Sequence, residues 1–205
     1  MKNEVFLEEN YIKEYVTINL IWVSIFAVIV LVIVLLFFGL AFYLLWLEKF
    51  ENIAKILELS PIRNLNENSL LNKGIIIFIL LSLVVIHEFI HGIFFSMFTK
   101  NKLKSVKFGF MPARKLFTPY CHCKEKLKIY NYQIALIMPL VIIGFIPTII
   151  SIIIGNNIIF CWGILSIAGC GGDILILLKT LKEKRECWIF DHPTEAGYYL
   201  YRKVN

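Results

Sequence analysis

The chain alternates between long apolar runs and shorter charged segments. Four runs, residues 18–46, 74–98, 132–154 and 158–180, contain very few charged side chains. As a helix, each run is long enough to cross the roughly 30 Å hydrocarbon core of a bilayer. We therefore predict an all-α polytopic membrane protein with four transmembrane helices.

Prolines and a polar turn interrupt the later runs. Pro139 and Pro147 lie inside the third run, where each removes a backbone hydrogen-bond donor and predicts a kink. The turn 155–157 joins the third and fourth runs as a helical hairpin. Beyond the last run, residues 191–195 combine a proline with an acidic residue, a pattern that indicates the start of a helix.

The connection between the second and third runs, residues 99–131, is too long to be a simple turn. Apolar Val106, Phe108 and Phe110 alternate there with other residues, as in a half-buried strand. We therefore predict a small β-like cytoplasmic insertion between helices 2 and 3.

Composition supports a membrane protein. The chain is 59% hydrophobic and 18% charged, whereas soluble domains average about 45–50% and about 25%. Its five cysteines include no CxxC pair, and their odd number argues against a disulfide framework.

The distribution of basic residues predicts the orientation. The 99–131 connection carries nine of the 21 Lys and Arg, whereas the 47–73 connection carries four. Four spans place both termini on the side of the 99–131 connection, and the positive-inside rule makes that side cytoplasmic. We expect a multi-pass protein of the cell membrane whose basic loop meets anionic lipid, with no nucleic-acid partner.

The second run contains the pattern HExxH, formed by His87, Glu88 and His91 with two residues between Glu88 and His91. Residues four apart lie on one face of a helix, so both imidazoles can reach one Zn²⁺ ion. Glu88 is then placed to take a proton from the attacking water. Ionisable groups within a bilayer are costly and are functional by default.

Asp173 is the candidate third metal ligand. Counted from the outer ends of their runs, Asp173 lies midway in depth between His87 and His91. The small residues Ser166, Gly169 and Cys170 share the helical face of Asp173, which favours close helix packing.

Two other histidines remain as alternatives to Asp173. His122 lies between two cysteines, and His192 lies between an aspartate and a proline. Both belong to segments that we predict to be cytoplasmic. We expect His122 to have a structural role in its loop and His192 to cap or turn the chain.

These residues resemble the zincin peptidase family of bacterial membrane proteins, which is similar to the site-2-protease class of intramembrane metalloproteases. The resemblance runs from about residue 73 to residue 204. It includes the HExxH segment, Gly172-Asp173 and residues 191–197. It implies a zincin-like membrane peptidase domain at residues 73–205, after an N-terminal membrane helix and linker at residues 1–72. It also implies Zn²⁺ held by His87, His91 and Asp173, with Glu88 as the catalytic acid–base.

We therefore predict a zinc-dependent metallopeptidase that hydrolyses membrane-embedded or membrane-proximal peptides. The alternative is a non-catalytic metal-binding or proton-coupled transport component, because intramembrane His and acidic residues also build ion paths.

Overall fold

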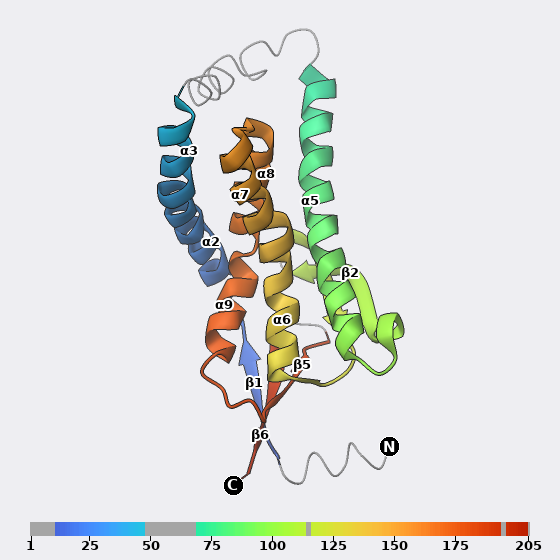
Figure 1. Ribbon diagram of the computed structural model, residues 1–205. Coiled ribbons are helices and arrows are strands. Elements are labelled where there is room, and N and C mark those ends of the chain that lie inside the picture. The colour runs from blue at the N-terminus through green and yellow to red at the C-terminus, as the bar shows by residue number, and fades with distance from the viewer. Residues whose placement is uncertain (1–10, 48–68, 114–115, 194–195, 205) are drawn as a thin grey trace. The chain divides into compact units, whose positions relative to one another are not determined.

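The computed structural model in Figure 1 describes residues 11–47, 69–113, 116–193 and 196–204. Residues 48–68, which form most of the predicted linker, lie outside the described residues. The chain divides into two compact units, each assembled from separate segments. The first comprises Met1–Phe26, Glu88–Pro139 and Gly171–Asn205, and the second comprises Ala27–His87 and Leu140–Cys170.

Helices make up most of the described chain. They are α2 (Leu20–Val34), α3 (Leu40–Leu45), α5 (Ser69–Phe98), α6 (Ile129–Pro139), α7 (Ile146–Ile154), α8 (Asn157–Gly169) and α9 (Gly171–Thr180). Shorter segments are two π-helical stretches, Leu35–Gly39 and Leu140–Phe145, and a 3₁₀ turn, Lys102–Ser105.

Three helical stretches among the described residues are long and apolar enough to cross a membrane. They are Leu20–Leu45, Ile77–Phe98 and Ile129–Ile154. The fourth predicted span is instead two helices, α8 and α9, which reach the required length only if they are counted together. Three of the four predicted spans are therefore found as long helices.

The chain leaves helical geometry at Cys170, between α8 and α9. Glycines flank this residue at positions 169, 171 and 172, and glycine is about 1 kcal/mol less favourable than alanine in a helix interior. The predicted continuous face from Ser166 to Asp173 is therefore interrupted.

The third span changes from α-helical to π-helical geometry after Pro139, where a kink was predicted. α6 ends at Pro139, a π-helical stretch follows, and α7 carries Pro147 in its first turn. Gly155 then ends α7 in the left-handed region with φ of 64°. The side chain of Asn156 accepts hydrogen bonds at the start of α8, which confirms the predicted hairpin turn.

The prediction of an all-α fold is wrong, because the first unit contains a four-stranded antiparallel sheet in the order β1-β6-β5-β4. Tyr198 and Leu200 alternate with less buried residues, as expected for a strand with one face on the core. The predicted helix start at Asp191 is also wrong, because Asp191 ends a strand. The strands are β1 (Tyr11–Thr17), β4 (Leu127–Lys128), β5 (Trp188–Asp191) and β6 (Gly197–Lys203).

The predicted β-like insertion is confirmed as a hairpin. Strands β2 (Val106–Ala113) and β3 (Leu116–Cys123) pair antiparallel with Val106 opposite Cys123. The loop after α5 is fixed by Glu125, whose carboxylate accepts hydrogen bonds from the backbone of Lys100 and Asn101.

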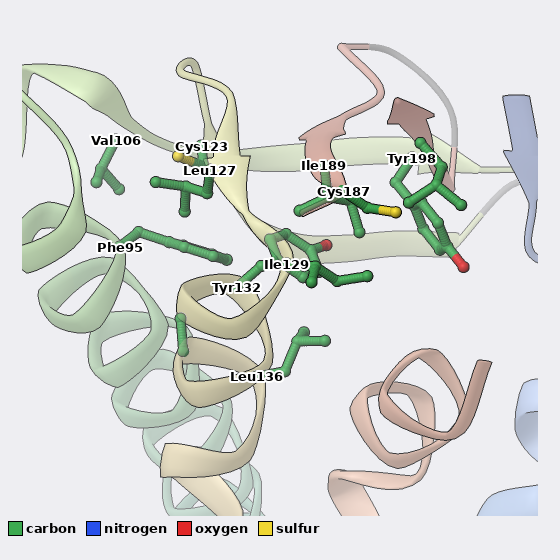
Figure 2. Packing of buried hydrophobic residues seen from close by; sticks show 12 residues of the cluster. Phe95, Val106, Cys123, Leu127, Ile129, Tyr132, Leu136, Cys187, Ile189 and Tyr198 are labelled. Carbon is green, nitrogen blue, oxygen red and sulfur yellow. The ribbon is translucent and has the colours of Figure 1, made fainter. Parts of the chain in front are cut away.

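One apolar cluster joins the elements of the first unit, and its packing is shown in Figure 2. Phe95 reaches from α5 toward Tyr132 on α6, with ring centroids 5.5 Å apart. Ile189 on β5 is fully buried in the same cluster. The cluster therefore fixes α5 and α6 against the sheet. Its other members are Val106, Cys123, Leu127, Ile129, Ala135, Leu136, Cys187, Tyr198 and Leu200.

The second unit is held by close contact between α7 and α8. A Cβ atom at Gly163 would overlap the Thr148 hydroxyl and lie 2.9 Å from the Thr148 amide nitrogen. The ring of Phe42 on α3 is fully buried and lies 4.5 Å from the Phe160 ring. Small residues thus let these apolar helices approach closely.

We predict that Gly163→Ala lowers the stability of the second unit by about 1–3 kcal/mol, because the added methyl forces α7 and α8 apart. Gly169→Ala is the matched control, since a Cβ at the end of the same helix meets nothing within 4 Å. Thermal unfolding in detergent checks this. Equal melting temperatures for the two variants would contradict it.

Candidate functional site

The first unit contains an open cavity of about 250 Å³. Polar side chains from distant parts of the chain gather around it. They are Glu88 and His91 of α5, His122 of β3, Tyr132 of α6, Asp173 of α9, Asp191 of β5, and His192. The cavity thus collects two residues of the HExxH pattern, the predicted third ligand and both alternative histidines.

His91 is held by a backbone carbonyl of α6. Its side chain is buried, and its Nδ1 lies 2.9 Å from the carbonyl oxygen of Ala135. Within an α-helix that carbonyl would accept from the amide of residue 139, but this residue is a proline and has no N–H. Pro139 therefore leaves the Ala135 carbonyl able to accept a hydrogen bond from the imidazole.

Asp173 lies next to the other nitrogen of the same ring. It is in the first turn of α9, and its Oδ1 is 3.4 Å from His91 Nε2. When Nδ1 donates to a carbonyl, Nε2 of a neutral imidazole carries a lone pair. The lone pair and the carboxylate then face each other, so a proton or a metal cation must stabilise the pair.

The spacing of this pair fits a metal ion. Two ligand atoms that are each about 2.0–2.2 Å from one tetrahedral zinc lie about 3.3–3.6 Å apart. The 3.4 Å between His91 Nε2 and Asp173 Oδ1 falls in this interval. A carbonyl that orients a ligand histidine through its second nitrogen is also typical of metal sites. The residues present therefore fit zinc.

His87 belongs to the second unit, where its Nδ1 lies 3.7 Å from the sulfur of Cys170. Cys170 is fully buried at the break before α9. An imidazole nitrogen and a sulfur at this distance are both possible metal donors. From its sequence position, Cys170 is expected only to help the helices pack closely.

Asp191 is a buried carboxylate on the sheet side of the cavity. Its Oδ1 accepts a hydrogen bond of 2.6 Å from the hydroxyl of Tyr132, and its Oδ2 accepts one of 2.9 Å from the backbone amide of Cys123. Burial raises the pKa of Asp191, while these two hydrogen bonds act in the opposite direction. Three elements, α6, β3 and β5, therefore converge on one carboxylate.

The two alternative ligands, His122 and His192, lie in the cavity wall, and each contacts side chains other than the proposed metal ligands. His122 Nδ1 is 4.0 Å from Asp191 Oδ2. The ring of His192 packs against Tyr15 and Tyr199, with centroids 4.8 and 5.1 Å away. His122 lies in β3, within the predicted β-like insertion, and its structural role stays a prediction.

One protein family matches residues 79–188, more than half of the 205-residue chain, and its description is "Putative zincin peptidase". The chain belongs to this family. No curated protein and no solved structure matches it. The description indicates a metallopeptidase, and zincins take their name from zinc.

The region that matches the zincin family contains most of the polar cavity wall. It includes the HExxH residues, the hairpin, α6 and Asp173, and it ends at the first residue of β5. Asp191 and His192 lie three and four residues beyond its end. The sequence predicts Asp191 only as part of a helix start, although an acidic residue straight after the apolar Trp188-Ile189-Phe190 is also a signal for a buried polar group.

We predict about one zinc per chain in detergent-purified protein, because His91 and Asp173 are spaced as two ligands of one ion. His91→Ala and Asp173→Ala should each lower zinc affinity at least tenfold. Elemental analysis after competition with a chelator measures this. His192→Ala is the control and should keep the metal, because its ring packs against Tyr15 and Tyr199. Loss of zinc in the control but not in Asp173→Ala would assign the third ligand to His192.

Proposed function

We propose that this protein is a zinc-dependent membrane metallopeptidase that hydrolyses peptide bonds within or near the bilayer. The observation that carries the proposal is the pairing of His91 Nε2 with Asp173 Oδ1 in a cavity that Glu88 also lines. Membership of the zincin family supports it. The location of Glu88 and His91 in the apolar stretch Ile77–Phe98 supports an intramembrane type, similar to the site-2-protease class.

In this proposal the metal ligands are His87, His91 and Asp173. The two histidines are four residues apart on the continuous helix α5, so both project from one face of that helix. Three protein ligands are usual for catalytic zinc and leave one coordination position for the reaction. Zinc, when bound, would polarise the scissile carbonyl and lower the pKa of the attacking water.

Glu88 is the proposed catalytic acid–base. It precedes the proposed ligand His91 by three residues on α5 and lines the same cavity. Its carboxylate would take a proton from the attacking water and deliver it to the leaving amine. Ala135 would keep the imidazole of His91 oriented through the carbonyl that accepts from Nδ1.

The cavity wall favours an apolar peptide as the substrate. Part of the cavity wall consists of aliphatic and aromatic side chains, which would accept an apolar residue next to the scissile bond. A membrane-embedded or membrane-proximal peptide has this chemistry. The apolar side chains are Ile18, Leu20, Val23, Phe95, Leu136 and Ile176.

We further propose that both termini and the hairpin segment lie in the cytoplasm of a multi-pass cell-membrane protein. The hairpin and its flanks expose several lysines, which suit the positive-inside rule and contact with anionic lipid. These are Lys100, Lys102, Lys104, Lys107 and Lys124.

We predict that Glu88→Gln abolishes hydrolysis and keeps zinc. The amide is nearly the same size as the carboxylate but cannot accept the proton, so turnover of fluorescently labelled β-casein should fall about 10²–10⁴-fold. Elemental analysis of the same sample is the control. Unchanged cleavage would rule out this role of Glu88, and metal transport into vesicles that survives Glu88→Gln would instead favour a transport component.

We predict that a reporter fused after residue 205 reports the cytoplasmic side. A fluorescent-protein fusion should be bright and an alkaline-phosphatase fusion inactive, because basic connections are kept on the cytoplasmic side of the membrane. A fusion in the 47–73 connection should give the opposite pair of signals. The same signal at both positions would contradict the proposed orientation.

A further inference from the structure

The cavity of the first unit has a second polar group besides the proposed metal ligands that line it. This group consists of His122, Asp191 and Tyr132, which come from β3, β5 and α6. The mechanism proposed above uses none of the three. They nevertheless line the same cavity as Glu88, His91 and Asp173.

Asp191 is held in one orientation by donors to both of its oxygens. Tyr132 donates to Oδ1 at 2.6 Å, and the backbone amide of Cys123 donates to Oδ2 at 2.9 Å. Tyr132 and Cys123 belong to the apolar cluster seen in Figure 2. A carboxylate in such surroundings is unfavourable unless it is hydrogen-bonded, and an apolar residue of similar size would often be as stable. Stability alone therefore does not account for a carboxylate at position 191.

His122 is the group that this carboxylate faces in the cavity. Its Nδ1 lies 4.0 Å from Asp191 Oδ2, and Phe190 meets the ring edge-on at 6.0 Å. Within the described part of the chain, Nε2 of His122 has no hydrogen-bond partner. Because the ring lines the cavity, this nitrogen can serve a molecule bound there.

The helix α6 carries residues that position both His91 and His122. Tyr132 and Ala135 are three residues apart and share a face of α6. Ala135 accepts from His91, whereas Tyr132 holds Asp191 beside His122. One rigid element thus fixes the spacing between the proposed metal ligand His91 and the second imidazole.

We propose that His122 contacts the reacting peptide group of the substrate through Nε2, and that Asp191 and Tyr132 are positioning residues that hold His122 for this contact. This inference rests on the proposed function, because it needs a peptide bond attacked at the metal end of the cavity.

Electrostatics support a hydrogen bond to the transition state. Burial lowers the pKa of His122, Asp191 opposes this, and Lys107, Lys124 and His192 reinforce it. The ring therefore tends to be neutral until negative charge develops on the substrate carbonyl oxygen. A carboxylate beside Nδ1 and this developing charge beside Nε2 together favour uptake of a second proton from water in the open cavity, so that the imidazolium ring donates from both nitrogens.

Two small inhibitors distinguish binding to the metal from the proposed contact with His122. Acetohydroxamate chelates the metal alone, whereas a phosphoramidate dipeptide, N-phosphoryl-Leu-Phe, also mimics the tetrahedral transition state. We expect His122→Ala in the zinc-loaded full chain to weaken phosphoramidate binding at least tenfold and to leave zinc content and acetohydroxamate binding unchanged. Isothermal titration measures both affinities. His122→Gln, whose amide can still donate, should recover part of the loss and serves if the alanine variant does not fold.

The roles of Asp191 and Tyr132 are tested by a double-mutant cycle. Asp191→Asn and Tyr132→Phe should weaken phosphoramidate binding in the wild type and add little once His122 is alanine. Additive losses would show that Asp191 and Tyr132 do not act through His122. An unchanged phosphoramidate affinity in His122→Ala would overturn the contact, and loss of zinc in that variant would make His122 a metal ligand instead. Zinc-loaded wild type that fails to bind acetohydroxamate would overturn the proposed function itself.

Discussion

The site depends on one hydrogen bond, from His91 Nδ1 to the carbonyl oxygen of Ala135. It exists because Pro139 has no amide hydrogen to offer that carbonyl. The bond fixes which nitrogen of His91 turns toward Asp173, and hence what can lie between them. A proline inside a helix thus leaves a backbone carbonyl without its intrahelical donor and available to a polar side chain.

The apolar cluster of the first unit makes this bond rigid. Phe95 lies one turn after His91 on α5 and packs against Tyr132 of α6, one turn before Ala135. The ring of His91 also stacks on Phe95, with centroids 6.1 Å apart. The helices that carry the donor and the acceptor are therefore packed together one turn away from the hydrogen bond. Orientation by packing as well as by hydrogen bonding is what a precise metal ligand requires.

Local patterns in the sequence predicted much of this arrangement. Three apolar runs became long helices, the alternation after Val106 became a hairpin, and Gly155 ended a helix as expected. Depth along the apolar runs and a face of small residues led us to pair Asp173 with His91, although the fourth run is two helices and not one. Each of these features depends on residues that are close in sequence or on a fixed helical repeat. The structure does not test the roles of Glu88 and His87, which stay proposals.

The sheet could not be predicted in the same way. β4 has two residues and β5 has four, which is too short for alternation to stand out, and the tyrosines of β6 also suit a membrane interface. The pairing of β1 with β6 joins opposite ends of the sequence. Asp191 acquires its partners only through such distant contacts, so no local pattern could reveal them. The break at Cys170 was visible as a cluster of glycines, but glycine is also common in membrane helices.

The strand order has a consequence for how the protein is made. β5 and β6 are the last described elements in the chain, whereas β1 precedes every described helix. A growing chain can therefore insert its helices, with the HExxH segment already present, before the sheet can form. The wall that contains Asp191 and His192 closes only when β6 has emerged from the ribosome and paired with β1. The cavity is thus completed only after the membrane-insertion machinery has handled the apolar segments that precede β6.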